Sequence, residues 1–351
     1  DQVLVGNISA LLNPLTYVVV NLGIVVILHA GAIEVNIGNL TTGQVVALIN
    51  YMSQILVELV KLANLIILLS KAAACAKRIN EIFDIKNSII SGNKELNLKD
   101  CDGDIISFEN VGFSYPQSKE ESLSNITFSV KKGETVGIIG GTGSGKTTLV
   151  NLIPRFYDIN SGSIKIAGKD ISAYSLDSLR KNVAMVEQKS RLFRGTIRDN
   201  LIWGNMLAGD DELYNAASIA QATDVISSKA DKLDSKVAMY GNNFSGGQKQ
   251  RLSITRSLVK KASILILDDA SSALDYGTDS RLRQAIREIP DITVIIVSQR
   301  IVSIKNADRI IVLDDGKVAG IGTHNELLEN NAIYKEICTS QLSAGEENNE
   351  K

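Results

Sequence analysis

Cysteine and histidine are both scarce in this chain of 351 residues. The three cysteines, Cys75, Cys101 and Cys338, lie far apart and form no CxxC pair. With this spacing neither a disulfide framework nor a zinc site is predicted, and we interpret the cysteines as reduced packing residues in a cytosolic setting. The two histidines, His29 and His324, are isolated as well. Because no second type of ligand accompanies His29, an interface or a bundle interior is favoured over a metal site.

A surplus of basic charge is missing too. The chain has 37 Lys and Arg residues against 39 Asp and Glu residues, which gives a formal net charge of −2. A surface that binds nucleic acid normally needs a basic excess. We therefore expect no nucleic acid among the partners.

Charge is absent altogether near the start of the chain. No charged side chain lies between Asp1 and Glu34, and residues 15–28 are strongly apolar. This pattern is typical of a membrane span. A signal peptide would need a basic start and a cleavage site, and the sequence has neither.

A second apolar stretch follows a polar turn. It runs over residues 45–70 and is interrupted by Glu58 and Lys61, which can partly neutralise each other three positions apart on a helix. We therefore predict two membrane helices, at about 11–33 and 43–75. On hydropathy alone, a soluble helical hairpin buried in a core remains the alternative.

Basic residues follow the second apolar stretch. Lys71, Lys77 and Arg78 mark this end as cytoplasmic by the positive-inside tendency, so everything downstream is expected in the cytoplasm. A polar connector rich in Asn, Ser and Gly then marks the boundary between domains.

A glycine-rich loop stands at the centre of the remaining chain. It follows the apolar run 135–139 and precedes the periodic segment 149–153, and this strand-loop-helix order is the context of a phosphate-binding P-loop. Backbone N–H groups of such a loop point at phosphate oxygens, and the following helix adds its dipole. We expect Lys146 to supply a charge to the outer phosphates and Thr147 a hydroxyl to Mg²⁺. The loop consists of Gly140, Gly141, Thr142, Gly143, Ser144, Gly145, Lys146, Thr147 and Thr148.

Two other interpretations of the loop fit less well. A glycine-rich turn without a ligand is the plain alternative, and the flanking strand and helix patterns disfavour it. A dinucleotide fingerprint would need the GxGxxG spacing, which the loop does not have.

Short apolar runs on either side of the loop predict a sheet. Unbroken apolar strands that alternate with helices indicate a parallel sheet covered on both faces. Asp268 ends one such strand, at the edge where a P-loop fold holds Mg²⁺, although an exposed strand cap would look the same. The predicted strands are 105–109, 125–130, 135–139, 163–167, 183–188, 263–267 and 293–297, followed by a hairpin of 309–313 and 318–321; a helix is predicted at 278–288.

Residues 244–251, Phe-Ser-Gly-Gly-Gln-Lys-Gln-Arg, resemble the signature motif of ABC transporter ATPases. The resemblance covers essentially the whole chain, which looks like the C-terminal portion of an ABC exporter half-transporter. It implies an α/β P-loop NTPase domain with a mixed sheet, a β-subdomain and a helical subdomain, preceded by two transmembrane helices. The implied domains are a partial transmembrane domain (1–84), a linker (85–103), an ABC nucleotide-binding domain (104–342) and a disordered tail (343–351).

The resemblance also implies roles for single residues. Tyr115 would stack on the adenine of ATP, although a plain strand-end aromatic fits the same position. Gln188 would be the Q-loop glutamine that touches Mg²⁺, which places Thr147, Gln188 and Asp268 around the metal. The signature residues Ser245, Gly246, Gly247 and Gln248 would close over ATP held by a second subunit, and the D-loop residues Ser272, Ala273, Leu274 and Asp275 would cross to that subunit.

The sequence departs from the family pattern at three positions. Asp269 stands where the family places a glutamate that polarises the attacking water, and Gln299 stands where it places a histidine. Met239 replaces an acidic residue common upstream of the signature. Since glutamine can hydrogen-bond a phosphate but cannot carry a proton, we expect this nucleotide site to be degenerate.

These departures lead to one hypothesis and several alternatives. The chain is expected to be the degenerate half of a heterodimeric exporter that binds ATP and Mg²⁺ and lends its signature to a partner half-transporter. The expected setting is multi-pass in the plasma membrane, in contact with the lipid bilayer. The expected cargo is an exported small molecule or lipid. A homodimer with slow hydrolysis, a soluble regulatory ABC ATPase and an importer ATPase are the alternatives. Because the chain begins with Asp and would have two of six membrane helices, we expect a partial sequence.

Overall fold

The computed structural model describes the backbone of residues 2–347 except 86–87, 99–102, 117 and 119, and the side chains of residues 14–341 with the same gaps. The chain divides into two compact units, residues 1–88 and residues 89–351. Each unit has its own packing and is described by itself.

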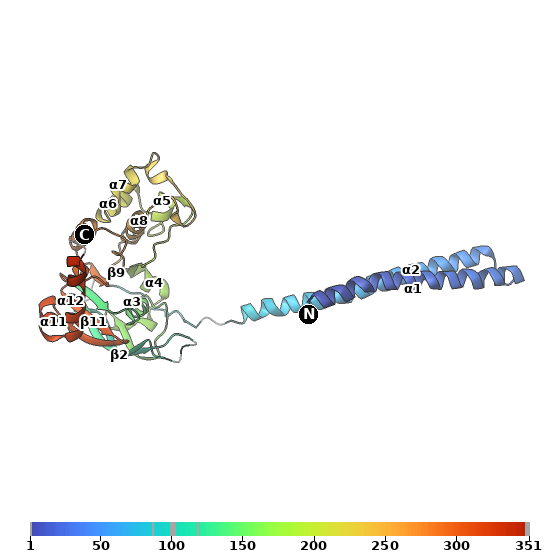
Figure 1. Ribbon diagram of the computed structural model, residues 1–351, viewed down its shortest axis with the longest axis horizontal. Helices are drawn as coiled ribbons and strands as arrows, with labels where there is room; N and C mark the ends of the chain where they lie inside the picture. The colour runs from blue at the N-terminus through green and yellow to red at the C-terminus, as the bar shows by residue number, and fades with distance from the viewer. Residues whose placement is uncertain (1, 86–87, 99–102, 117, 119, 348–351) are drawn as a thin grey trace. The chain divides into compact units, whose positions relative to one another are not determined.

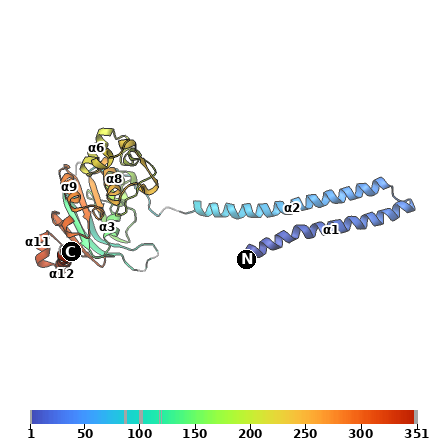
Figure 2. The ribbon, with the colours of Figure 1, turned by 45° about the horizontal axis from the view of Figure 1, so that its top comes forward.

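The first unit is a pair of long helices, α1 (Gln2–Ile37) and α2 (Thr42–Phe83), joined by a short turn (Figures 1 and 2). A capping box begins α2: the Gln44 backbone N–H donates to the Thr41 hydroxyl, and the Thr41 N–H donates to the Gln44 side chain at 2.8 Å. Both helices are longer than the predicted 11–33 and 43–75. Helix α1 begins before Pro14, and α2 continues through its basic residues because nothing there breaks a helix.

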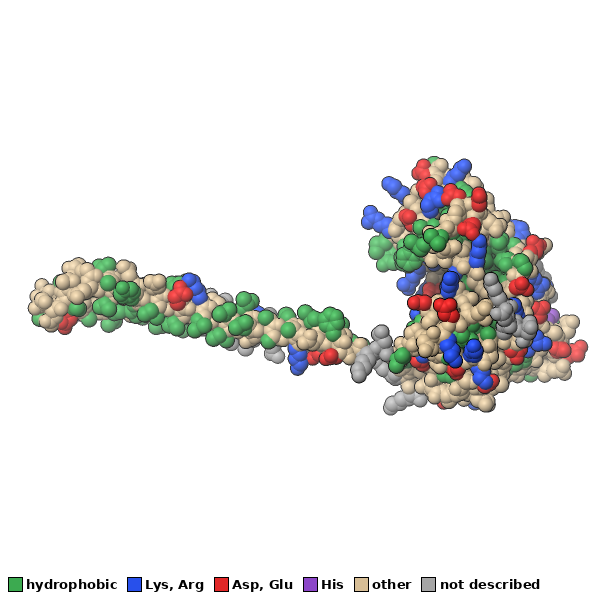
Figure 3. All heavy atoms as spheres, turned by 180° about the vertical axis from the view of Figure 1, so that it is seen from behind, with side chains coloured by type: hydrophobic (Ala, Val, Ile, Leu, Met, Phe, Trp, Pro, Cys, Tyr) green, Lys and Arg blue, Asp and Glu red, His purple; other side chains and the backbone are tan. Residues whose placement is uncertain are grey.

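The two helices approach each other at small residues. A Cβ atom at Gly31 would lie 2.7 Å from Val45 Cγ1, and one at Gly23 would lie 2.9 Å from Met52 Cε. Residues 14–37 and 42–83 are long and apolar enough to cross a membrane. Their apolar windows are almost entirely unburied, which is not the burial of a core hairpin in a soluble protein. Figure 3 shows hydrophobic side chains over much of this surface.

The second unit is built on a six-stranded mixed sheet with the order β12-β11-β3-β10-β9-β6. Strands β11, β3, β10, β9 and β6 are parallel, and β12 pairs antiparallel with β11 as the predicted closing hairpin. A four-stranded antiparallel sheet, β2-β1-β4-β5, and the short pair β7-β8 complete the strands of the described residues.

The strands are β1 (Asp104–Phe113), β2 (Leu123–Lys131), β3 (Thr135–Gly140), β4 (Ser161–Ile166), β5 (Lys169–Asp170), β6 (Val183–Val186), β7 (Gly195–Thr196), β8 (Lys236–Val237), β9 (Ile264–Asp268), β10 (Thr293–Val297), β11 (Arg309–Asp314) and β12 (Lys317–Gly322). The helices are α3 (Lys146–Leu152), α4 (Leu176–Asn182), α5 (Ile197–Leu201), α6 (Asp210–Ile219), α7 (Thr223–Ser227), α8 (Gly246–Val259), α9 (Tyr276–Arg287), α10 (Ile301–Ile304), α11 (His324–Asn330) and α12 (Ala332–Glu347).

The central strands are buried on both faces, as their unbroken apolar runs predict. Ile138, Ile266 and Ile295 pack against the four-stranded sheet. Ile139 and Leu265, on the other face, pack in a core with apolar residues of α6, α8 and α9. The sheet is therefore the middle layer, and the pairing of its parallel strands fixes their carboxyl ends relative to one another.

The structure differs from the predicted linker and the predicted disordered tail. Residues 89–98 of the predicted linker belong to the second unit, since Leu96 and Leu98 are buried and the Ile90 carbonyl accepts a hydrogen bond from Arg155. The predicted disordered tail begins as helix, because α12 continues through Glu347; residues 348–351 lie outside the described residues.

The cysteines give a mixed outcome. Cys338 is buried, as a packing residue should be, but Cys75 is exposed on α2. Cys101 lies outside the described residues. His324 is structural in this fold, because its Nδ1 atom and the buried Tyr334 hydroxyl are hydrogen-bonded at 2.8 Å.

Candidate nucleotide-binding site

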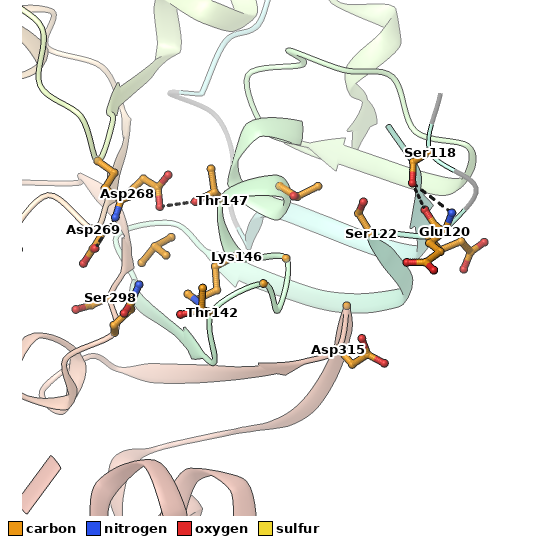
Figure 4. A pocket seen from close by; sticks show the side chains of 18 residues that line it. Ser118, Glu120, Ser122, Thr142, Lys146, Thr147, Asp268, Asp269, Ser298 and Asp315 are labelled. Atoms are coloured by element: carbon orange, nitrogen blue, oxygen red, sulfur yellow. Dashed lines mark hydrogen bonds between the residues drawn. The ribbon is translucent and has the colours of Figure 1, made fainter. Parts of the chain in front are cut away.

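A pocket of about 490 Å³ lies at the carboxyl edge of the six-stranded sheet. Parallel strands end together at this edge, so residues distant in sequence meet there. Figure 4 shows Lys146, Thr147, Asp268, Asp269 and Ser298 together, with Ser118, Glu120 and Ser122 at the other end. The lining residues are Ser118, Glu120, Glu121, Ser122, Thr142, Gly143, Gly145, Lys146, Thr147, Thr148, Gln188, Asp268, Asp269, Val297, Ser298, Gln299, Asp315 and Gly316.

The P-loop follows β3 and leads into α3, in the predicted strand-loop-helix order. Gly140 has no room for a side chain, because a Cβ atom there would lie 2.1 Å from the Leu313 carbonyl oxygen of β11. Gly145 precedes α3 with a φ of 91°, a left-handed conformation that glycine adopts without a steric penalty. The glycines therefore let the loop curl against the neighbouring strand and enter the helix.

Lys146 folds back over its own loop. Its Nζ atom donates to the Gly140 carbonyl at 2.9 Å, to the Gly141 carbonyl at 2.6 Å and to the Ser144 hydroxyl at 3.3 Å. Burial lowers the pKa of the Lys146 ammonium, and the nearby aspartates oppose that shift. All three acceptors are neutral, so phosphate oxygens would replace them with a gain in Coulomb energy.

Thr147 and Asp268, two of the predicted Mg²⁺ ligands, are in contact with each other. The Thr147 hydroxyl donates to Asp268 Oδ1 at 3.2 Å, and Asp268 is buried at the end of β9. Burial raises the pKa of Asp268, while the bond from Thr147 opposes this. Hydroxyl and carboxylate oxygens are hard ligands that fit Mg²⁺, which takes most of its ligands from phosphates and water. Consistently, the described residues contain no cluster of three His, Cys, Asp or Glu side chains suited to a metal held by protein alone.

Gln188, Asp269 and Gln299 lie in the same pocket, on the loops after β6, β9 and β10. Gln188 Nε2 donates to Asp269 Oδ2 at 3.1 Å. Burial raises the pKa of Asp269, and the bond from Gln188 and the charge of Arg300 work against this shift. Asp269 has a φ of 47°, and its N–H donates to the Val297 carbonyl at 2.9 Å. The backbone of Asp269 is thus tied to the end of β10.

Tyr115 stands beside the pocket and is not among its lining residues. Its hydroxyl is 3.1 Å from the hydroxyl of Thr148, which does line the pocket. Its ring packs edge-on against Phe113 and Tyr157, with centroids 4.9 and 5.1 Å away. The adenine-stacking role of Tyr115 stays a prediction, and the strand-end aromatic interpretation fits these contacts equally well.

The signature lies apart from this pocket. Ser245 is the N-cap of α8: its hydroxyl accepts from the Gln248 N–H at 3.3 Å, and its own N–H donates to Gln248 Oε1 at 3.0 Å. Ser245 and Gly246 are exposed, and none of the four signature residues lines the pocket. The chain therefore keeps its signature away from its own P-loop.

The D-loop connects the two regions. The Ser272 hydroxyl donates to the Asp269 carbonyl at 2.9 Å, and Asp275 caps α9 by accepting from the Thr278 N–H at 2.9 Å. A Cβ atom at Gly247 would lie 3.0 Å from the Ala273 carbonyl oxygen, so the signature helix begins directly against the D-loop. Leu274 is buried beneath it.

Sequence reasoning missed one side of the pocket. Ser118, Glu120, Glu121 and Ser122 precede β2, and Asp315 lies in the turn between β11 and β12. That turn was predicted as a hairpin, but its approach to the P-loop depends on the pairing of β11 with β3, which no local motif encodes.

Comparisons with known proteins agree with this geometry. The sequence profile of the family described as ABC transporter matches residues 123–272. The chain is 39% identical over 329 residues to an uncharacterized ABC transporter ATP-binding protein of Bacillus subtilis, YfiB, and covers 57% of it. It is 33% identical over 349 residues to an ATP-dependent lipid A-core flippase of Vibrio vulnificus, and covers 58% of it. These alignments take in 94% and 96% of this chain.

A solved structure of an ABC exporter is also similar to this chain. A bacterial Atm1-family ABC exporter with ATP bound matches 95% of this chain with a TM-score of 0.83 and 31% identity, and the match covers 58% of that protein. The chain thus spans somewhat more than half the length of the proteins it resembles. Taken together with the pocket at the sheet edge, these matches show the P-loop NTPase fold as it occurs in ABC transporters, preceded by two apolar helices, with residues 123–272 similar to the ABC transporter family.

Proposed function

We propose that the chain is the ATP-binding and membrane-spanning subunit of an ABC exporter, acting in the plasma membrane with its nucleotide-binding domain in the cytoplasm. Relatives named as a lipid A-core flippase and as a putative multidrug export protein support export as the direction of transport. The two apolar helices support membrane insertion, and the basic residues after them favour a cytoplasmic ATPase. A small molecule or a lipid would be the cargo.

ATP would bind with its phosphates at the P-loop and its base toward the acidic end of the pocket. Lys146 would pair with the outer phosphates, and Thr147, Gln188 and Asp268 would hold Mg²⁺, which neutralises phosphate charge when bound. Tyr115 would face the adenine from beside Thr148. Lys146, Thr147, Gln188 and Asp268 line the pocket, which supports these assignments.

We further propose that this pocket holds ATP and hydrolyses it slowly. The observation that carries the proposal is that Asp269 and Gln299 line the same pocket as a complete P-loop. An aspartate carboxylate stands about 1 Å farther from the attacking water than a glutamate would, and such a displacement can cost on the order of a hundredfold in rate. Gln299 can bind a phosphate oxygen but cannot supply positive charge to it.

The exposed signature favours action on another subunit. Ser245 and the N–H groups of Gly246 and Gly247 begin a helix of fourteen residues, where an anion is stabilised by the helix dipole. Since these residues do not line the chain's own pocket, their nucleotide would come from a partner. A dimer is then required, and the substituted pocket favours a heterodimer in which the competent site is built from the partner's P-loop and this signature.

The test restores the two family residues in the full-length protein, co-purified with its partner. The partner's own site is silenced by replacing its catalytic carboxylate, so the remaining ATP turnover belongs to this pocket. Asp269→Glu with Gln299→His should raise that turnover by about a hundredfold. Asp314→Glu, an exposed carboxylate outside the pocket, serves as the matched control and should change nothing. Unchanged turnover in the double variant would refute the degenerate-site proposal.

A homodimer with slow hydrolysis is the second candidate. It shares the substituted pocket but needs no other polypeptide. Native mass spectrometry of the tagged protein, purified from its own host, separates the two: a complex of two different half-transporters supports the heterodimer, and a dimer of identical chains supports the alternative.

A further inference from the structure

One side of α2 carries polar side chains in the middle of its apolar run. Asn50, Gln54, Glu58 and Lys61 are all exposed in the helix pair. Their spacings of four, four and three residues place them along one side of a helix. We call these four residues the polar face of α2.

The polar face points away from α1. Val45 is the buried residue of α2 against Gly31. Gln54 follows Val45 by nine residues, about two and a half helical turns, and so lies on the opposite side of α2. The polar face is therefore not explained by packing between the two helices.

An ion pair occupies the cytoplasmic half of this face. Lys61 Nζ lies 2.8 Å from Glu58 Oε1, and the two side chains are 65% and 60% exposed. Glu58 stands about 24 Å along the helix from Thr42, within the roughly 30 Å of a hydrocarbon core that α2 would enter at its first turn. Charged groups at such depth face a bundle interior or a water-filled cavity, because lipid contact is too costly.

We propose that the polar face of α2 lines the path of the exported cargo and binds zwitterionic amphiphiles. This inference rests on the export function proposed above. The reason for a zwitterion is charge balance: opening a Glu58–Lys61 pair in a low dielectric is costly unless both charges find new partners. A cation would leave Lys61 unpaired, and an anion would leave Glu58 unpaired. A ligand with an anionic and a cationic group satisfies both.

The two amides of the face add to the same site. Gln54 and Asn50 lie about one and two turns nearer the start of α2 than Glu58. Each offers a carbonyl acceptor and an NH₂ donor, so they can bind uncharged polar atoms of the cargo. At one end of the polar face, Glu58 and Lys61 can exchange their ion pair for pairs with the ligand. At the other end the amides can form hydrogen bonds, and the apolar residues beside the face suit an alkyl chain.

The experiment uses the full-length protein with its partner, reconstituted in vesicles of phosphatidylglycerol and an uncharged glycolipid, which contain no zwitterionic lipid. Three fluorescent amphiphiles share one alkyl chain and carry a phosphocholine, trimethylammonium or sulfonate head group, and ATP-dependent transport of each is measured. Glu58→Gln and Lys61→Gln should each lower phosphocholine transport about tenfold. Glu58→Gln should turn preference toward the sulfonate, and Lys61→Gln toward the trimethylammonium probe.

The charge swap Glu58→Lys with Lys61→Glu keeps the pair and should keep phosphocholine transport, which guards against loss through misfolding of the single variants. Lys77→Gln and Glu81→Gln make the same chemical changes on α2 beyond the apolar run and should leave the preference unaltered. If the ratio of the three probes is the same in every variant, or if the wild type favours another probe over phosphocholine, the inference is overturned while export stands. If the wild type moves none of the probes, the inference is likewise overturned, while export of another small molecule stands.

Discussion

The P-loop and the signature are two glycine-rich loops that each begin a helix, yet they are completed in different ways. Gly145 precedes α3 without a side-chain cap, whereas the Ser245 side chain caps α8. Side chains from the ends of four neighbouring strands surround the P-loop and enclose a pocket, but Ser245 and Gly246 are exposed. The comparison teaches that an anion-binding loop becomes a nucleotide site only when other elements close around it. For the signature, those elements would belong to another chain.

The largest effect should come from removing the P-loop ammonium. Lys146→Ala deletes the one cation among the pocket's described lining residues, so ATP affinity should fall by about a hundredfold or more. Binding of a fluorescent ATP analogue to this site, with the partner's site blocked, measures the loss. Lys181→Ala, an exposed lysine on α4, is the matched control. If Lys146→Ala retains its affinity for ATP, the P-loop is not the nucleotide site that its comparison with the signature assumes.

A smaller and differently located effect should follow from changing the signature cap. Ser245→Asp keeps a capping oxygen at the start of α8 but places a negative charge where an anion is expected. ATP turnover at the partner's site should fall by about tenfold, while ATP affinity at this chain's own P-loop stays unchanged. Ser245→Asn preserves the cap without the charge and should retain far more activity. Equal loss in both variants would mean that the cap, rather than the anion site, is what matters.

The smallest effect concerns stability. Burial raises the pKa of Asp268, so above that pKa the folded state carries the cost of a buried charge. Asp268→Asn keeps the acceptor for Thr147 and removes the charge, so it should raise the melting temperature without nucleotide by about 2 to 4 °C at pH 7. The gain should shrink as pH falls through the raised pKa, where the wild-type carboxyl becomes neutral. Thermal scans at several pH values check this.

Mg²⁺ and ATP should reverse the order of the two melting temperatures, because the Asp268 charge that costs stability is the one proposed to hold the metal. The wild type should then be stabilised more than Asp268→Asn. A variant that gains as much from Mg²⁺ and ATP as the wild type does would place the metal elsewhere in the pocket.

Much of the pocket was predictable because its parts are local patterns. The P-loop and the strand ending in Asp268 each show in a few consecutive residues. Local sequence patterns do not predict burial that depends on tertiary packing. Leu96 and Leu98 are two apolar residues in a polar stretch, and only the folded domain shows that they are buried. The extent of α2 beyond its apolar run escaped the same reasoning, since hydropathy marks a span and not the end of a helix.

The sequence by itself determined the chemistry available to this protein: a glycine-rich phosphate loop, a carboxylate at the end of an apolar strand, an aspartate at position 269, a glutamine at 299 and a motif that resembles the ABC signature. Tertiary structure decided which of these meet. The parallel order of β11, β3, β10, β9 and β6 brings their carboxyl ends to one edge and gathers Gln188, Asp268, Asp269 and Gln299 around the P-loop, while α8 presents the signature to solvent. The physical reason is that strand pairing is set by long-range burial of the sheet, which short motifs do not encode.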